Sequence, residues 1–493
     1  MQRYRILFLA LMFGTGRFLY PDDCCHPSVD CDASISGDCD EISNDCPTAI
    51  STYLNPRSIT NDLTYRNSGT FFERFRGEVS CAFFTLDSTF LYQQNRKSAH
   101  LGRGFFGENP LLFAEQSAPF NSLNLGLGSK QPEGFSSMVR LSPKREVFAW
   151  LPQFIFNLDC FCPGTWADCA FAVTRVKHHI CLFEQRTTFG DLTNEPSSVR
   201  EALDTLEVFP LSRHHTGVDD IQVRLGYVMG YCEDDMFSVY LLGNIPTGKK
   251  FDDTRWFQPY VGSRRGGVGA GVMFDGNLWL SELDGTECLL MAELKYLYSF
   301  GDKQRRQFDL KNGPLSRFLL IAAEDNVDTP LQGGINLLRA CAHLEPQHTL
   351  EWWLAFHYTW CCWGFEGGYN LWYRSAEKLT IKDSAFDFEN FGIYDLTRCT
   401  DLTSHSTAKI SDTFGQGTPD ADFVKLTGSA VNRNSAISQK ALSSTFSGTV
   451  TYATNWCDYP VNLAFGARYE LASKHHASAL ENWGVYGKIA VSC

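Results

Sequence analysis

The chain has 493 residues, of which 44% are hydrophobic and 14% aromatic, and its formal net charge is -13. An acidic chain without a dense basic stripe excludes nucleic acid as a partner. The 38 Phe and 40 Gly residues, with charged residues at only 20%, are typical of strands that are apolar on one face.

The first 16 residues predict a secretory signal peptide. Arg3 and Arg5 precede an apolar run at 6–13, and the small residues Gly14 to Gly16 follow it. The alternative is a short buried strand. The run is too short to cross a bilayer as a helix, and no other stretch has the required length, so a membrane protein of this sequence must cross as strands.

Residues 17–70 form an acidic, cysteine-rich segment that we assign to the periplasm. In an exported protein such cysteines predict disulfides within or between chains. Zinc or calcium is the alternative, but the segment contains neither paired C-x-x-C motifs nor a Gly-centred calcium loop. We therefore expect no metal and no cofactor. The cysteines are Cys24, Cys25, Cys31, Cys39 and Cys46.

From residue 71 onward, segments that alternate between apolar and polar residues recur. In 221–232, for example, Val223, Leu225 and Tyr227 alternate with Gln222 and Arg224. The alternation continues through 483–493, as expected of a strand that closes against the first one. About twelve strands are predicted, at 78–92, 146–159, 168–185, 221–232, 236–246, 267–274, 286–299, 349–361, 365–379, 438–453, 461–472 and 477–493.

The connections between these strands are sorted by length. The long ones are 93–145, 186–220, 247–266, 300–348 and 380–437, and they alternate with short ones, so all long connections fall on one side. Outer-membrane barrels have short periplasmic turns and long external loops. The sequence thus predicts an all-β, antiparallel, up-and-down transmembrane β-barrel over residues 71–493. A soluble jelly roll or sandwich has no reason to sort its loops. A short helix at 308–322 is a candidate constriction or plug.

Charged residues of both signs fall on the strand face opposite the aromatic residues. In a barrel this face lines a water-filled lumen, whereas the apolar face meets lipid. The alternative is the solvated face of a soluble all-β protein. The predicted lumen-lining residues are Arg224, Glu293, Lys295, Glu351, His357, Glu366, Arg374, Arg468, Glu470 and Lys488.

No motif indicates catalysis, and we expect no enzymatic activity. The stretch 243–250 approaches a phosphate-binding loop, but Lys250 replaces the required Ser or Thr and no helix follows. Neither G-x-S-x-G nor H-E-x-x-H is present. The His pairs, such as His214 and His215, occupy adjacent strand positions that point to opposite faces.

The terminal strand, the loop alternation and strands such as 364–374 make the chain similar to porin-like outer-membrane β-barrel proteins of Gram-negative-type bacteria. The resemblance implies insertion by the barrel-assembly machinery, which recognises an aromatic final residue where this chain has Cys493. In composition the chain also resembles the cysteine-rich major outer-membrane porins of intracellular bacteria, whose envelopes are held by disulfide cross-links.

These observations together predict a porin-like channel in the bacterial outer membrane. Small solutes would diffuse passively through its charged lumen, and outer-membrane lipid would surround it. One alternative is a structural barrel that is linked to other envelope proteins by disulfides. Another is a plugged barrel that takes up apolar compounds.

Overall fold

A computed structural model describes residues 55–71, 83–95, 110–114, 120–121, 135–186, 198–201, 212–232, 235–248, 258–281, 285–311, 317, 320–323, 332–386, 388, 390–395, 422–457, 459–473 and 480–493. The chain divides into one unit of residues 1–48 and a second unit of residues 49–493, and all described residues belong to the second. Among them, no helix combines the length and the apolar character needed to span a membrane.

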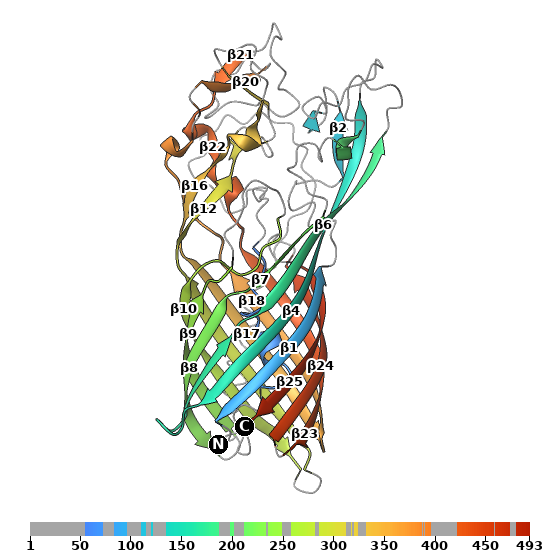
Figure 1. Ribbon diagram of the computed structural model, residues 1–493, viewed down its shortest axis with the longest axis vertical. Coiled ribbons are helices and arrows are strands. Elements are labelled where there is room, and N and C mark those ends of the chain that lie inside the picture. The colour runs from blue at the N-terminus through green and yellow to red at the C-terminus, as the bar shows by residue number, and fades with distance from the viewer. Residues whose placement is uncertain are drawn as a thin grey trace, which may run out of the picture. The chain divides into compact units, whose positions relative to one another are not determined.

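The described part of this unit contains a closed barrel of 12 antiparallel strands (Figure 1). Two of these strands are interrupted and carry two labels each. The barrel strands are β1 (Phe84–Asn95), β4 (Ser136–Asn157), β5 (Thr165–Ala170) with β6 (Val173–Arg186), β7 (Ser212–Val218) with β8 (Ile221–Cys232), β9 (Asp235–Ile245), β10 (Gly267–Leu280), β11 (Glu287–Ser299), β17 (Gln347–Trp360), β18 (Trp363–Arg374), β23 (Ala441–Trp456), β24 (Tyr459–Ala472) and β25 (Asn482–Ser492).

Closure of the sheet follows from the pairing of the first strand with the last. β1 pairs with β25 over its whole length, from Thr85 opposite Ser492 to Asn95 opposite Asn482, and on its other side with β4. Every barrel strand thus has a partner on both sides, which removes the sheet edge. The predicted transmembrane barrel fold and the predicted closing strand are confirmed.

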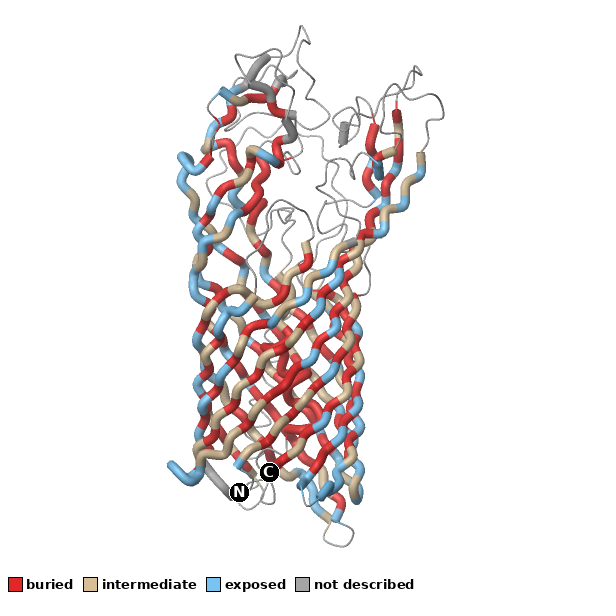
Figure 2. The backbone as a smooth tube through the Cα atoms, viewed as in Figure 1, coloured by how far each residue is buried: buried red, intermediate tan, exposed pale blue. Residues whose placement is uncertain are grey.

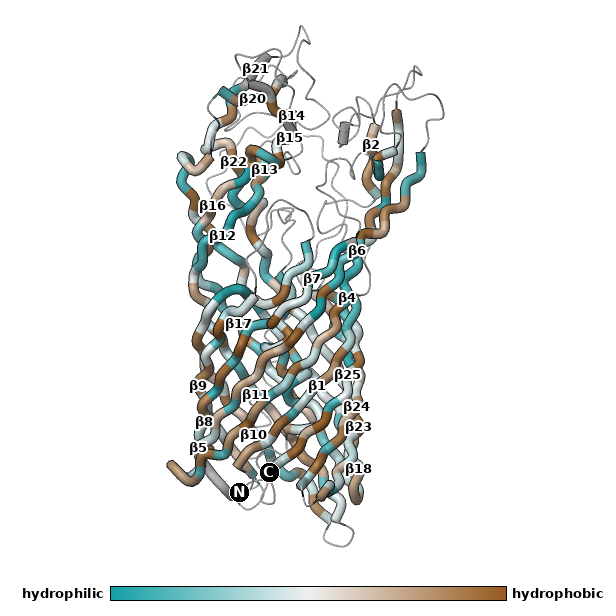
Figure 3. Tube along the Cα trace, in the orientation of Figure 1, coloured by the Kyte–Doolittle hydropathy of each residue, from teal (hydrophilic) through white to brown (hydrophobic). Residues whose placement is uncertain are grey.

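The wall is apolar outside and polar inside. On β8, Val223, Leu225 and Tyr227 are 41%, 55% and 47% exposed, whereas Gln222 and Arg224 between them are fully buried. Figures 2 and 3 show the same alternation around the barrel. Exposed aromatic residues lie near both ends of the strands, as in the aromatic girdles of membrane barrels. They include Trp360, Trp363, Trp456 and Tyr459 at one end and Tyr296, Tyr373 and Trp483 toward the other.

Two neighbouring strands are interrupted at the same level of the wall. β5 and β6 are separated by Phe171 and Ala172, and β7 and β8 by Asp219 and Asp220. The Asp219 backbone N–H donates to the Ala172 carbonyl at 2.7 Å, which bridges the two breaks. Residues 212–218, predicted as part of a long loop, therefore continue the wall.

The long connections leave the barrel at the end opposite Cys493 and form small sheets (Figure 1). The sheets contain β12 (Asp302–Gln307), β16 (Arg339–Leu344) and β19 (Leu379–Thr380); β13 (Asp309–Leu310) and β22 (Val431–Asn432); and β14 (Leu320–Ala323), β15 (Gln332–Gly333), β20 (Phe391–Asp395) and β21 (Asp422–Lys425). Beside them, β2 (Leu111–Ala114) pairs with the outer part of β4 and with β3 (Phe120–Asn121). Four 3-10 turns complete them: η5 (Gly334–Asn336), η6 (Asp383–Ala385), η8 (Gly428–Ala430) and η9 (Arg433–Ala436).

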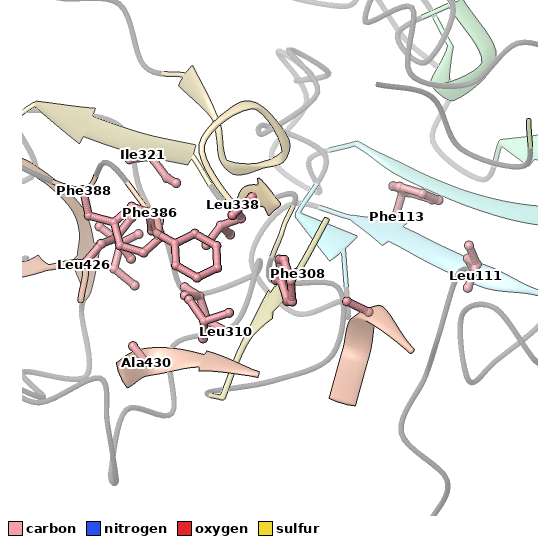
Figure 4. Packing of buried hydrophobic residues seen from close by; sticks show 14 of the residues in the cluster. Leu111, Phe113, Phe308, Leu310, Ile321, Leu338, Phe386, Phe388, Leu426 and Ala430 are labelled. Atoms are coloured by element: carbon pink, nitrogen blue, oxygen red, sulfur yellow. The ribbon is translucent and has the colours of Figure 1, made fainter. Parts of the chain in front are cut away.

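These external sheets have an ordinary apolar core (Figure 4). Phe308, Leu310 and Leu338 are fully buried in it, and the rings of Phe308 and Phe386 meet edge to face at 5.3 Å. The helix predicted at 308–322 is wrong for the residues that the structure describes, because 309–310 and 320–323 are strands. The alternating apolar residues of this stretch pair with other loop strands instead.

Candidate functional site: a plugged lumen

The lumen is occupied by residues 55–71, which we call the plug. Its helix α2 (Leu63–Asn67) begins after Asp62, whose carboxylate accepts a hydrogen bond from the Thr64 backbone N–H at 3.0 Å. Residues 59–71 are all buried and contact inward-facing residues of strands around the barrel. Residues 55–70 were predicted to belong to the periplasmic segment; the structure places them inside the barrel. Residues 17–54 lie outside the described part of the chain.

At the centre of the plug, Arg66 meets a network of charged wall residues. Its guanidinium pairs with the Asp168 carboxylate at 2.9 Å. Arg224 binds the same carboxylate and also pairs with Glu293 at 2.9 Å. The Asn67 amide donates to the other oxygen of Glu293 at 2.8 Å. One wall arginine therefore holds together the two carboxylates that bind the plug here.

The start of α2 is held by Glu351 on β17. The Leu63 backbone N–H donates to one carboxylate oxygen at 2.8 Å, and Lys295 on β11 pairs with the other oxygen at 2.8 Å. The Asn370 amide donates to Glu351 at 2.9 Å, and Arg57 of the plug also pairs with this carboxylate. A carboxylate accepts several such hydrogen bonds at once, so Glu351 satisfies a free helix N–H and keeps its wall partner.

Asp62, the residue that caps α2, pairs with Arg468 on β24. Arg468 pairs at the same time with Glu470, its neighbour on the same face of the strand, at 2.7 Å. Within the plug, Arg57 lies 3.1 Å from the Asp62 carboxylate. Asp62 is therefore paired both inside the plug and with the wall.

The end of the plug passes close to β18, β24 and β25. The Gly69 backbone N–H donates to Glu366 at 2.9 Å, and the Thr70 hydroxyl donates to Asp87 at 2.7 Å. Lys488 donates to the Arg66 carbonyl and to the Thr70 hydroxyl, both at 3.1 Å. Gly69 has a φ of +80°, and a Cβ there would lie 2.7 Å from the Cβ of Ala464. Only glycine fits this position without strain.

All ten residues predicted to line the lumen are buried on the inward face, and the structure brings them together around the plug. Seven bind it directly: Glu293, Lys295, Glu351, Glu366, Arg374, Arg468 and Lys488. The other three, Arg224, His357 and Glu470, pair with members of that set. That these residues line a solute path stays a prediction.

Sequence reasoning missed Asp87 and Asp168 of the wall and the whole plug. The two aspartates alternate with outward-facing residues on β1 and β5. The alternation that identified the other lumen residues would therefore have identified these two as well. No comparable signal marks the plug. Many of its polar residues have partners more than 100 positions away, such as Asp168 for Arg66.

Most of the wall charges that bind the plug also have partners of opposite charge on the wall itself. Asp168 and Glu293 share Arg224, Glu351 has Lys295, and Arg468 has Glu470. Lys488 similarly lies 3.4 Å from Asp87. Leaving a buried charge unpaired is strongly unfavourable. Because these pairs lie within the wall, departure of the plug would not leave these wall charges unpaired.

Two small cavities lie between plug and wall beside residues 56–59. Each holds about 10 Å³, enough for roughly one water molecule. Charged and polar residues of plug and wall line both cavities, together with apolar residues such as Ile59.

These features define the class of protein: a transmembrane β-barrel of the outer-membrane type, with a polar lumen filled by its own N-terminal segment. The barrel presents lipid with apolar side chains and leaves no sheet edge unpaired, which are the two requirements of a bilayer-spanning sheet.

Similar barrels occur among solved structures. An outer-membrane channel from Pseudomonas putida F1 aligns over 84% of this chain and 96% of its own, with 9% identity and a TM-score of 0.35. A mutant of the monoaromatic hydrocarbon channel TodX covers 90% and 98%, with 7% identity and a TM-score of 0.33. A FadL homologue from Pseudomonas aeruginosa covers 90% and 98%, with 7% identity and a TM-score of 0.28. At such scores they carry no argument about function.

No protein-family model matches the chain, and no curated protein matches it. The class assignment thus rests on the wall and lumen of the barrel itself.

Proposed function

We propose that the protein is a channel of the bacterial outer membrane for small polar solutes, closed by the plug and opened when the plug leaves. The observation that carries this proposal is the pairing of the plug-binding wall charges with one another. Such a wall keeps its ion pairs when water replaces the plug. In the open state, solutes cross by passive diffusion.

The polar lining favours polar over apolar cargo. Carboxylates, guanidinium groups and amides face the plug along its length, and Leu63 and Phe71 of the plug pack beside them against apolar wall residues such as Trp353. The apolar hollow of about 640 Å³ formed by Leu225, Tyr227, Leu241 and Leu294 lies on the lipid-facing side of β8 to β11. We therefore favour the channel over uptake of apolar compounds through the lumen.

Deletion of residues 55–71 tests the channel. In planar bilayers the wild-type barrel should show little current, and the deleted barrel should show large, ohmic steps. A matched control removes residues 24–46, which carry the cysteines, and keeps the plug; it should stay closed. Heat-modifiable gel migration checks that each variant is folded. A folded barrel that lacks the plug and passes no current would overturn the proposal.

A second candidate function, anchoring to envelope proteins through disulfides, is favoured by the placement of cysteines. The ten cysteines whose side chains the structure describes are free. Cys160, Cys162, Cys361 and Cys457 are exposed in turns between barrel strands, at the end of the barrel where Cys493 also lies exposed. Cys361 and Cys457 have φ values of 56° and 49°, a region that non-glycine residues seldom adopt.

Non-reducing electrophoresis of isolated envelopes tests anchoring. High-mass species that collapse to the monomer with a reductant are expected, and their loss when these five cysteines are replaced by serine would identify the rim as their source. A monomer under non-reducing conditions would exclude this function. The cysteines within residues 24–46, which this hypothesis expects to tether neighbouring proteins, lie outside the described residues.

A further inference from the structure

Arg145 is a basic residue of the lumen whose guanidinium forms no hydrogen bond and no ion pair with the described residues. It lies on β4, points inward and is 5% exposed. Its backbone N–H donates to Asn95, but among the described residues its side chain makes no hydrogen bond and no ion pair, and its Nε is buried without an acceptor. In contrast, Arg224 and Arg468 each bind carboxylates.

A buried guanidinium without a direct hydrogen bond or ion pair is costly, because the nearby charges of Asp219 and Glu470 offset its lost hydration only in part. Charges of this kind are retained mainly where a function uses them. Arg145 is therefore placed to bind a negatively charged group that comes from outside the chain.

Arg145 lines both of the small cavities beside the plug. The two cavities share Pro56, Arg57 and Ile59 of the plug. The first also contacts the amide side chains of Gln93 and Asn482, together with Asp62 and Glu470. The second also contacts Asp219 and the Tyr260 side chain. A group bound to Arg145 would thus touch the wall and the first residues of the plug together.

We infer that Arg145 binds the carboxylate of a small monoanionic solute. A guanidinium offers a planar pair of N–H donors that matches the two oxygens of a carboxylate. Asp62, Glu470 and Asp219 line the same cavities and repel a second negative charge, which disfavours a phosphate dianion. The amides of Gln93 and Asn482 are further hydrogen-bond donors within the first cavity.

Binding at this position opposes closure. Each cavity has room for roughly one water molecule, so a carboxylate such as acetate fits only if residues 56–59 of the plug move away. The solute therefore binds the open state better, and by linkage it shifts the protein toward that state. This inference names a solute class for the channel proposed above and rests on that function.

The test is a binding measurement on the full-length protein in a non-ionic detergent. Titration calorimetry with acetate and butyrate should show binding, whereas inorganic phosphate at neutral pH should bind more weakly. R145Q should weaken acetate binding about tenfold or more, the range for a lost charge-assisted hydrogen-bond pair. The matched control is R140Q, which removes an exposed arginine from the same strand and should bind like the wild type.

Thermal unfolding gives a second readout that does not depend on current. Without ligand, R145Q should unfold at a higher temperature than the wild type, because it removes a buried charge that has no direct partner. Acetate should raise the unfolding temperature of the wild type and of R140Q only. Equal acetate binding by R145Q and the wild type, absence of acetate binding by the wild type, or tighter binding of phosphate would overturn the inference. The conductance of the barrel that lacks residues 55–71 is measured separately. Failure of the proposed channel function can therefore be distinguished from failure of the Arg145 binding site.

Discussion

The barrel and the external sheets bury different mixtures of residues. Inside the barrel, charged residues such as Arg66, Arg224 and Glu293 are fully buried beside an apolar cluster that includes Met273, Leu289 and Trp353, whereas the core of the external sheets consists mainly of apolar residues such as Phe308 and Leu338. The outward face of the barrel also differs from that of a soluble sheet, because it exposes large apolar side chains such as Phe465, which is 66% exposed. The solvent explains the difference: lipid surrounds one region and water the other.

The two regions are consequently held together by different interactions. In the external sheets, burial of apolar surface supplies the stability, as in a soluble domain. In the barrel, the strand ladders and the paired charges of the lumen supply it together with a smaller apolar cluster around Trp353. Each region should therefore respond to substitutions that leave the other unchanged.

The largest effect is expected in the lumen. Asp168→Asn leaves Arg66 and Arg224 with one carboxylate fewer at a buried site, which should cost about 3–5 kcal/mol. Urea unfolding in detergent measures the change. The control is Asp383→Asn in the external sheets, where the ion pair with Arg433 is 57% and 50% exposed and should contribute at most about 1 kcal/mol. Similar losses for both variants would contradict the comparison.

Two leucine substitutions, one in each region, test the same comparison with apolar side chains. Leu338→Ala removes a fully buried side chain from the external core and should cost about 2–5 kcal/mol. Leu463→Ala removes a side chain that is 41% exposed on the lipid face of β24, where acyl chains fill the space, so its cost should stay below about 1 kcal/mol. Hydrogen exchange of the external strands distinguishes the two variants, because only Leu338→Ala should reduce protection there. Equal losses of protection in both variants would argue against two distinct cores.

A pH effect is expected where the two regions meet. Glu377, beyond the outer end of β18, pairs with Arg265 at 2.7 Å and with Arg306 at 3.3 Å. Burial alone would raise the pKa of Glu377, but the charges of Arg306 and Arg265 hold that pKa below its ordinary value of 4.5. The stabilisation is therefore present above pH 4.5 and is lost as the pH falls through the lower, folded-state pKa.

Glu377→Gln should accordingly cost about 1.5–3 kcal/mol at pH 7, because hydrogen bonds to charged groups are lost. The difference from the wild type should shrink as the solution is acidified below pH 4.5. Thermal unfolding at a series of pH values checks this. A difference that grows on acidification would show that the sign is wrong.

The smallest effect concerns the end of the plug. Gly69→Ala places a Cβ at a positive φ and 2.7 Å from Ala464, which should cost about 1–2 kcal/mol for the backbone alone. Brief openings of the channel should become more frequent in bilayer recordings. Gly448→Ala on β23, where a new Cβ has no neighbour within 4 Å, is the control. Unchanged recordings for Gly69→Ala would mean that this end of the plug does not limit closure.

Much of the barrel could be predicted from the sequence because lipid imposes a local rule. Alternate residues of each strand must differ, and this period of two appears directly in stretches such as 221–232. The predicted positions of the strand ends were less accurate. Residues 267–274 were predicted, whereas β10 continues to Leu280 past a bulge near Asn277, where the alternation shifts.

The plug and the external strands could not be predicted in the same way. Asp62 and Arg468 are 406 positions apart, and the sequence around either residue does not indicate that the two pair. Ser212–Val218 contains adjacent histidines and no apolar period, so its place in the wall follows only from pairing with β6. Such contacts depend on the whole barrel being closed first.

The plug and the wall belong to one chain. Phe71, the last described residue of the plug, is 13 positions before Phe84 at the start of β1, so a released plug stays within about 45 Å of its binding site at full chain extension. Rebinding is then intramolecular, at an effective concentration in the millimolar range. The channel should reclose at a rate that does not depend on how many copies the membrane holds.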